Sequence, residues 1–572
     1  MENRIILPIK LLLLIPFILF TFIYSKQYIQ LLLISFVIII SYKHFFKLLP
    51  LYLITIFFSY SFYNLGATYI PKSYHLYKKN QIINLELNNS SDLDKICYFY
   101  GINRNLKLNI EIKKNAKWQK VLETNPNVLS FQWQCKKINI KNVKNMRFIS
   151  KKGFAELREL RLFHKNTLIP YFTLNNKIND EQYIKTTKKY LYNMIFDETY
   201  VPLTSYEIIN GIYPLYENTH PLLGEQIIAI SIKLFGMNPF GWRFASVIFG
   251  AFFIIVIYYF SLYLFNNTLY AFTSAYLMLY SFMHFTLSRV GLIDTFGAFF
   301  TLCSFWLLLI FIKKQKLIWL FLSSVFYGLA SSVKWVAALS ALGYIAIAIY
   351  LILSHYPLRK KFQKYKLIAY GILNYALVSP IIYLLSFFYI YIHSNFTSII
   401  KYQINMFNYH KNLSATHPYS SPWWSWPLDI KPLCTYRNIQ GDVFSSITIF
   451  GNPAIFWISI VSLIYLFYSF TKKANIEKAI IIFGFISLYL PYIFVNRIMF
   501  IYHYYYAIPF VILAIVYSIK EFLSKYNKLY ILWGYLTLNT SLFLMFYPVL
   551  SGYEVNQNYI RTYLKWLSSW WL

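Results

Sequence analysis

The sequence predicts a polytopic α-helical membrane protein of about thirteen spans with an inserted extracytoplasmic all-β sandwich domain. Three observations lead to this fold class. The chain is 58% hydrophobic and only 13% charged, whereas soluble domains carry about a quarter charged residues. Apolar runs of about twenty residues recur along it, which is the length needed to cross the hydrocarbon layer as a helix. Residues 66–170 show short alternating runs instead, and these are typical of strands.

The apolar runs define the predicted spans, which lie at 5–24, 28–45, 48–64, 241–264, 268–286, 292–312, 317–333, 336–354, 367–390, 453–470, 478–496, 505–519 and 529–547. If the N-terminus is inside, the short basic loops KKQK (313–316), RKKFQKYK (359–366) and TKKANIEK (471–478) are all cytoplasmic, as the positive-inside rule requires. A net charge of +33 could indicate nucleic-acid binding, but its distribution over these short loops predicts a cell-membrane protein instead, and we do not expect nucleic acid as a partner.

The same topology places 65–240, 391–452 and the C-terminal tail outside. It divides the chain into five parts: N-terminal spans (1–65), a β-domain (66–170), a membrane region with the first external loop (171–390), a Trp-rich loop (391–452), and four spans with a tail (453–572).

The predicted β-domain contains runs such as KICYFYG, KLNIEI, KINIK and MRFIS, separated by turns rich in Asn, Lys and Gly. These runs resemble the discoidin-like domains inserted in some bacterial membrane glycosyltransferases. The domain could serve as a spacer or lid, or it could bind sugar or cell wall. Cys97 and Cys135 lie within it, and they could form a disulfide in an oxidising compartment or remain two thiols.

Two adjacent carboxylates, Asp197 and Glu198, stand in the apolar stretch YNMIFDETYVP (192–202). About twenty residues later, ENTHPLLGEQ introduces His220 and then an apolar helix of about fourteen residues, which is too short to span the membrane. Such a helix suits the membrane interface. We therefore expect these three side chains at the outer boundary, where a lipid substrate would arrive.

From here to the C-terminus the chain resembles the protein O-mannosyltransferase family, which has a C-type glycosyltransferase fold and uses polyprenyl-phosphate-mannose. The motifs follow the family's order: FDE (196–198), NPFGWRFASVIFG (238–250), LSRVGLIDTF (287–296), GLASSVKW (328–335), THPYSSPWWSWPL (416–428), FGNP (450–453) and RIMFIYHYYYAIPF (497–510). The HPLLGE segment matches only in part. Leu222 replaces a family proline, and Glu225 stands where the family usually has lysine.

The resemblance implies that Asp197 is the general base for the incoming hydroxyl, with Glu198 as its supporting neighbour. The chemistry agrees, because burial at a membrane boundary raises the pKa of a carboxylate towards the working pH. The alternative is an exposed acidic pair that caps a loop helix. The family requires no metal, and we expect neither a metal nor a cofactor.

The leaving phosphate needs positive charge. Arg243, or Arg497 with His503, could supply it, since arginine binds phosphate through a planar charged fork. A charged side chain at this depth could instead simply extend to the headgroups. Asp294 and Arg289 are further candidates for binding the donor phosphate or sugar, because charged side chains within the membrane are costly. Pairing of Asp294 with Arg289 as a structural clamp is the alternative.

Lys334 could contact the phosphate or pair with Asp294. The loop after residue 390 contains His417, Trp423 and Trp424. Tryptophans at this depth act as interfacial anchors, but they also make platforms for sugar rings. Together with His220, these three residues are the candidates for an acceptor or substrate loop.

We therefore expect an inverting transferase that moves mannose from a polyprenyl-phosphate carrier to Ser or Thr hydroxyls of exported proteins. The expected partners are that carrier, an exported protein or peptide, and membrane lipids; family members can also pair. One alternative is a lipid or cell-wall acceptor for the same donor class. The other is a non-catalytic binder or flippase of lipid-linked sugar, although a flippase would need polar residues spread across the membrane midplane.

Overall fold

The computed structural model describes residues 3–25, 45–124, 130–165, 167–173, 189–354 and 364–572. The chain folds into two compact units, each described by itself below. The first, mainly helical, comprises Met1–Leu65, Thr204–Ser231 and Trp242–Leu572. The second comprises Gly66–Leu203 and Ile232–Gly241 and contains the β-rich segment.

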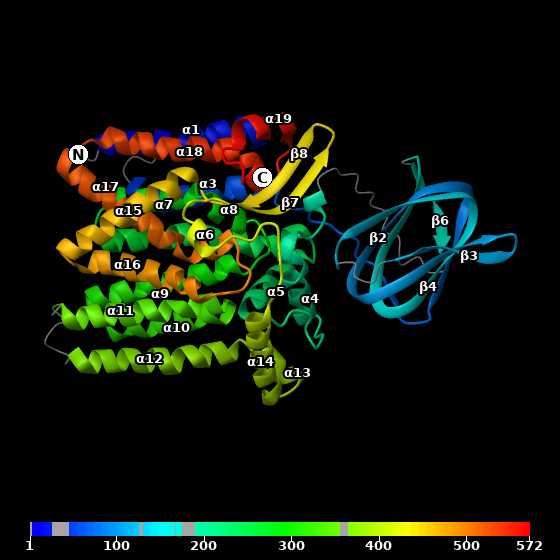
Figure 1. The fold of residues 1–572 in the computed structure, drawn as a ribbon, viewed down its shortest axis with the longest axis horizontal. Coiled ribbons are helices and arrows are strands. Elements are labelled where there is room, and N and C mark those ends of the chain that lie inside the picture. Colours follow the sequence, from blue (N-terminus) through cyan, green and yellow to red (C-terminus); the bar gives the residue numbers. More distant parts are fainter. Residues whose placement is uncertain (1–2, 26–44, 125–129, 166, 174–188, 355–363) are drawn as a thin grey trace. The chain divides into compact units, whose positions relative to one another are not determined.

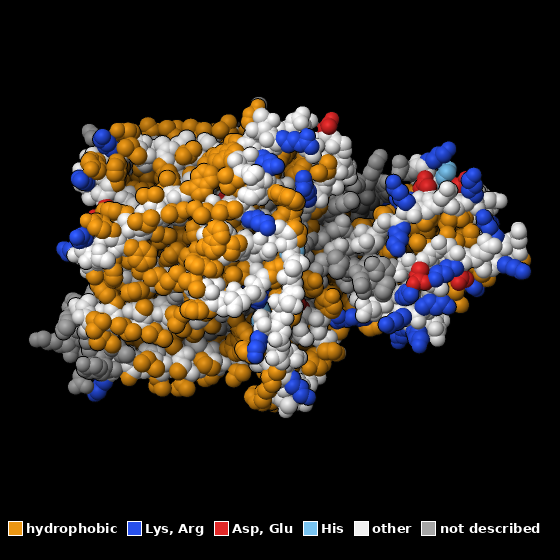
Figure 2. Space-filling view, in the orientation of Figure 1, with side chains coloured by type: hydrophobic (Ala, Val, Ile, Leu, Met, Phe, Trp, Pro, Cys, Tyr) orange, Lys and Arg blue, Asp and Glu red, His pale blue; other side chains and the backbone are white. Residues whose placement is uncertain are grey.

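The helical unit is a stack of long apolar helices (Figure 1). Within the described residues, seven helical segments are long and apolar enough to cross a membrane: Pro239–Phe265 (α6), Asp294–Lys314 (α9), Trp335–Leu353 (η5 and α11), Pro453–Lys472 (α15), Ile476–Phe494 (α16 and η7), Ile501–Tyr526 (η8 and α17) and Leu529–Ser551 (α18). Five more are shorter: α1 (Asn3–Phe20), α3 (Phe45–Phe62), α7 (Thr268–Leu279), α10 (Leu317–Val333) and α12 (Lys364–Leu385). Hydrophobic side chains cover the middle of this unit, and Lys and Arg gather towards its ends (Figure 2).

These helices coincide with the predicted spans, except at two places. The predicted span 28–45 lies almost wholly outside the described residues. The predicted span 268–286 is interrupted at Tyr280 and Ser281, and the chain continues as the short helix α8 (Phe282–Leu287). The fold class predicted from composition and apolar runs is thus confirmed as a multi-pass membrane protein.

Shorter elements gather at one end of the helical unit (Figure 1). They are α4 (Val201–Ile209), α5 (Leu223–Phe235), α13 (Phe388–His393), α14 (Phe396–Asn412), η6 (Trp423–Ser425), β7 (Leu433–Gln440), β8 (Val443–Ile449), β9 (Val555–Asn556), α19 (Gln557–Tyr559) and the π-helix η9 (Ile560–Leu564). The short helix predicted after His220 is α5. Asn395 caps α14 by accepting a hydrogen bond from the Ser398 N–H, which fixes where that helix begins.

The second unit contains a six-stranded antiparallel sheet of β1 (His75–Tyr77), β2 (Ile82–Lys114), β3 (Lys117–Glu123), β4 (Trp133–His164), β5 (Thr167–Ile169) and β6 (Tyr171–Thr173). Both edges of β2 pair with β4, because β4 is long enough to pass β2 twice. Lys95 of β2, for example, lies opposite both Lys137 and Phe163 of β4. The sheet therefore curls around a single apolar core.

This unit confirms the β-rich segment, but the short runs do not form separate strands. The many short runs merge into two long strands, because the Asn, Lys and Gly positions between them are bulges and register shifts within β2 and β4. The discoidin-like assignment stays a prediction. Cys97 and Cys135 lie opposite each other in the register and are joined by a disulfide.

Candidate functional site

The turn that precedes α5 is organised around the Glu217 carboxylate. Its Oε1 accepts hydrogen bonds from the Thr219 N–H (2.8 Å) and from the Thr219 hydroxyl, and it lies 3.3 Å from Nδ1 of His220. Burial raises the pKa of Glu217, but the hydrogen bonds from His220 and Thr219 and the charge of the ring outweigh it, so the net pKa lies below its usual value. Glu217 and Thr219 therefore fix the orientation of the His220 ring.

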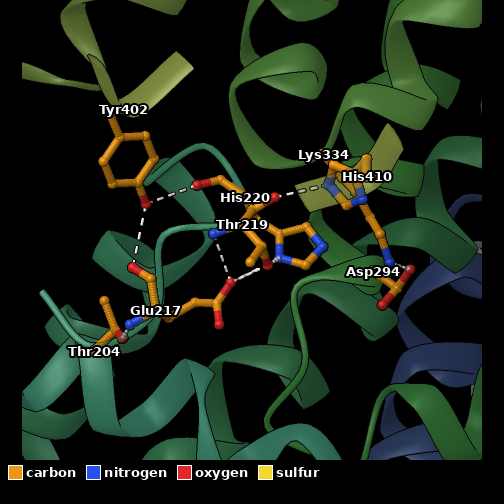
Figure 3. Close-up of polar contacts among 8 residues, drawn as sticks. All are labelled: Thr204, Glu217, Thr219, His220, Asp294, Lys334, Tyr402 and His410. Carbon is orange, nitrogen blue, oxygen red and sulfur yellow. Dashed lines mark hydrogen bonds and ion pairs between the residues drawn. The ribbon is translucent and has the colours of Figure 1, made fainter. Parts of the chain in front are cut away.

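Two side chains of helix α14, Tyr402 and His410, form hydrogen bonds with the backbone of this turn (Figure 3). The Tyr402 hydroxyl donates to the carbonyl oxygens of Glu217 (3.3 Å) and His220 (3.0 Å). His410 Nε2 donates to the carbonyl of Thr219 at 2.8 Å, and its ring centroid lies 5.7 Å from that of His220. Two segments almost two hundred residues apart in sequence thus form one rigid polar cluster.

A buried ion pair lies beside this cluster. Lys334, which follows the last residue of α10, places its ammonium 2.8 Å from Oδ1 of Asp294, the first residue of α9. The same ammonium lies 4.9 Å from the ring centroid of Tyr502. Of the two pairings considered for Asp294, the structure selects Lys334.

Cations and carboxylates both lie around the turn. Burial, together with the charges of Arg497, His220 and Lys334, lowers the pKa of His410 to about 4, although its hydrogen bond to Thr219 acts the other way. Burial is the larger cause of this low pKa, and the nearby cations add to it. The Lys334 ammonium and the Arg497 guanidinium are groups of the kind that bind phosphate.

The partly matching HPLLGE segment is packed against the ion pair. Leu222 is fully buried in an apolar cluster with Tyr402. A Cβ added to Gly224 would come within 2.4 Å of the side chain of Ile293, the residue before Asp294, so only glycine allows this approach. Glu225 is fully buried, and neither of its carboxylate oxygens has a hydrogen-bond partner among the residues that the structure describes.

Asp197 and Glu198 belong to the second unit. They form part of the single 3-10 turn η4 (Phe196–Thr199), and their side chains differ in environment. Glu198 is fully buried, and its Oε2 accepts a 2.9 Å hydrogen bond from the Ile195 N–H. Asp197 is half-buried. The expected division of roles is therefore compatible with the structure, since Glu198 caps the turn that carries Asp197.

Arg289 binds backbone carbonyl oxygens, whereas the sequence led us to expect a pairing with Asp294 or a contact with the donor. Its guanidinium donates to the carbonyl oxygens of Tyr60, Ser61 and Tyr63 at 2.7–2.9 Å, where α3 ends. It is therefore a cap for that helix and does not clamp Asp294. Arg243 is likewise buried and donates to the Leu65 carbonyl at 2.8 Å.

Some side chains of the Trp-rich loop pack against neighbouring rings, and others are exposed. Trp424 is 55% exposed, whereas Trp423 packs against Tyr489 with ring centroids 5.4 Å apart. His417 contacts the ring of Phe500. His503 is buried, and its Nδ1 lies 2.9 Å from the Phe500 carbonyl. Only Trp424 of these residues offers an open aromatic face of the kind a sugar or a headgroup could use.

Sequence reasoning missed Glu217, Tyr402 and Tyr502 as parts of the site. The spacing of Glu217 and His220, three residues apart with Thr219 between them, was an available signal for a hydrogen-bonded turn. Tyr502 lies within the RIMFIYHYYYAIPF motif (497–510), which was an available signal, whereas nothing near Tyr402 distinguishes it among the 55 tyrosines of the chain.

Comparison with known proteins identifies related sequences and structures. Residues 219–384 match the family model for dolichyl-phosphate-mannose–protein mannosyltransferases, and residues 395–570 match the C-terminal four-span region of protein O-mannosyltransferases. A polyprenol-phosphate-mannose–protein mannosyltransferase of Corynebacterium glutamicum is 23% identical over 436 residues, covering 61% of this chain and 81% of that protein. A protein of the same name from Mycobacterium tuberculosis is 22% identical, covering 66% and 86%.

Among solved structures, the S. cerevisiae protein O-mannosyltransferase complex bound to its sugar donor superimposes with a TM-score of 0.58 at 14% identity. The superposition covers 66% of this chain and 89% of the yeast chain. At this identity the likeness concerns the fold, which is the C-type glycosyltransferase fold.

Proposed function

Because this chain belongs to the protein O-mannosyltransferase family, we propose that it transfers mannose from a polyprenyl-phosphate carrier to Ser or Thr hydroxyls of exported proteins. The observation that carries the proposal is the cationic surrounding that the buried Lys334 ammonium provides beside the turn of His220, where it lies 2.8 Å from Asp294. A departing phosphate needs such a cationic surrounding. We place this site on the extracytoplasmic face of the cell membrane, as the distribution of basic loops favours.

The reaction is a single displacement. The acceptor hydroxyl attacks the anomeric carbon opposite the phosphate, its proton passes to Asp197, and the carbon–oxygen bond to the phosphate breaks. The products are a mannosylated protein with inverted anomeric configuration and the polyprenyl phosphate. Asp197 is assigned as the base because it stands in the matching Phe-Asp-Glu motif, and Lys334 with Arg497 would stabilise the charge on the leaving group.

The test is transfer of labelled mannose from polyprenyl-phosphate-mannose to a Ser/Thr-rich peptide in membranes that contain the wild type or Asp197→Asn. We expect transfer by the wild type and its loss in the variant. Asp442→Asn, which changes an exposed aspartate, is the matched control and should keep full activity. We also expect EDTA to leave the rate unchanged, because no step needs a metal.

Equal transfer by the wild type and Asp197→Asn would remove Asp197 as the base. Label that enters lipid or polymer while the peptide stays unlabelled would favour the alternative acceptor class. The specific reason to keep that alternative is Glu225, which replaces the usual family lysine with a buried carboxyl group.

A further inference from the structure

A polar pocket of about 300 Å³ lies in the helical unit and shares no residue with the candidate site. The β7–β8 hairpin, the short helices α19 and η9, and the C-terminal segment enclose it. Its walls are formed by Arg437, Phe444, Gln557, Ile560, Arg561, Lys565, Trp570, Trp571 and Leu572.

The side-chain charges of this pocket have a single sign. Three of its side chains are cations, Arg437, Arg561 and Lys565, and none is an aspartate or glutamate. All three are exposed, and within the described residues no carboxylate side chain lies within 4.0 Å of them. Three cations held together repel one another, so an anion in the pocket would relieve that repulsion. Two guanidinium forks and one ammonium suit a phosphate group.

The pocket's position in the chain places it at a membrane boundary. β8 leads directly into the apolar helix α15, and the segment that carries Arg561 and Lys565 follows directly after α18. Three aromatic side chains of this segment are largely exposed: Tyr563 (56%), Trp566 (41%) and Trp571 (58%). Exposed Trp and Tyr at the ends of spans are typical of headgroup depth. Lys and Arg side chains gather over this region of the surface in Figure 2.

We propose that this pocket binds the phosphate group of an anionic membrane lipid, with Arg437, Arg561 and Lys565 as the phosphate contacts and the exposed aromatic rings at the level of the headgroups. The lipid is favoured over a soluble phosphate because the hairpin that carries Arg437 precedes the membrane-spanning helix α15, and the segment that carries Arg561 and Lys565 follows the membrane-spanning helix α18. This site is separate from the transfer reaction and does not depend on it.

The test is native mass spectrometry of the full chain, purified in mild detergent, with added phosphatidylglycerol or phosphatidylcholine. The wild type should retain phosphatidylglycerol in preference to phosphatidylcholine. The triple variant Arg437→Gln, Arg561→Gln, Lys565→Gln should lose that preference, and the affinity for phosphatidylglycerol should fall by about a hundredfold, since each basic residue near an anionic lipid contributes about fivefold. The three single variants should each show a smaller loss.

The matched control is Lys472→Gln, Lys473→Gln, Lys528→Gln, which removes three exposed lysines from the opposite ends of α15 and α18. This variant should keep the preference for phosphatidylglycerol. Equal losses in the two triple variants would overturn the proposal, because net charge alone would then explain binding. Displacement of the lipid by millimolar inorganic phosphate would overturn the assignment to a lipid, since the pocket would then take free phosphate.

Discussion

Lys334 and Asp294 lie 2.8 Å apart although forty residues separate them in the sequence, and the pair joins the end of α10 to the start of α9. Both side chains are more than nine-tenths buried. Removing one partner from such a pair leaves the other charge buried without compensation, whereas removing both does not. Comparing the single and the double variant therefore distinguishes a structural role of the pair from a role of Lys334 in binding phosphate.

We therefore expect Lys334→Met to destabilise the protein by about 3–5 kcal/mol and to abolish transfer. The double variant Lys334→Met, Asp294→Asn should regain most of the thermal stability, measured by unfolding in detergent, but should remain inactive because the ammonium is absent. If the double variant transferred mannose at the wild-type rate, Lys334 would have no part in binding the phosphate.

Tyr402→Phe tests the support of the turn that carries His220. The substitution keeps the ring but removes the hydroxyl that donates to the carbonyls of Glu217 and His220. The expected cost is about 1–2 kcal/mol of stability, accompanied by slower transfer because His220 is held less firmly. Tyr391→Phe, at a tyrosine that is 53% exposed on α13, should change neither quantity.

Glu225 should make stability depend on pH. Burial raises its pKa to about 8, the Glu217 charge adds to the shift, and the Lys334 charge opposes it. Between the ordinary pKa of 4.5 and about 8, the folded chain therefore binds a proton that the unfolded chain has lost. Stability should fall as pH rises through this window, by at most about 1.4 kcal/mol per pH unit.

The measurement is the unfolding temperature in detergent across that pH range. Glu225→Gln keeps the shape of the side chain without a titrating proton, so its curve should be flatter than that of the wild type. Asp442→Asn changes an exposed carboxylate and should leave the curve unchanged. Parallel curves for the wild type and Glu225→Gln would show that Glu225 titrates at its ordinary pKa.

Asp429 should tolerate asparagine but not alanine. Its backbone φ is +56°, a region in which asparagine is tolerated better than alanine. Its Oδ1 accepts a 3.0 Å hydrogen bond from the Gly451 N–H, and burial raises the pKa of its carboxyl group well above the usual value. Asp429→Asn keeps the acceptor and should unfold at nearly the same temperature. Asp429→Ala should lose about 1–3 kcal/mol, because the Gly451 N–H is left buried without a partner.

The sequence was most informative where a pattern is local. The apolar runs of α9, α15 and α18 are continuous in the sequence, so their positions followed from length and hydropathy alone. In the β-rich unit, each short run was recognisable, but the merging of runs into β2 and β4 depends on pairing between distant segments. Alternation within a run does not reveal whether the next turn is a hairpin or a bulge.

The site was predictable only in part for the same reason. Asp294 and Lys334 could be proposed because charges within apolar sequence are rare. The actual role of Arg289 could not, because its partners are backbone carbonyls of α3 more than two hundred residues earlier. Backbone carbonyls have no sequence signature, so an arginine that caps a distant helix resembles one that binds a phosphate.

The contacts of α14 with the turn before α5 can form only after α14 has been synthesised. Tyr402 and Glu217 are 185 residues apart, and His410 and Thr219 are 191 residues apart. At about 5–20 residues per second of synthesis, the turn therefore waits about ten to forty seconds for the helix that completes it. During that interval the turn lacks the contacts that α14 makes with it. Ribosome-bound chains that end before α14 should therefore be cleaved by protease at the turn. Chains that extend beyond α14 should be protected from this cleavage.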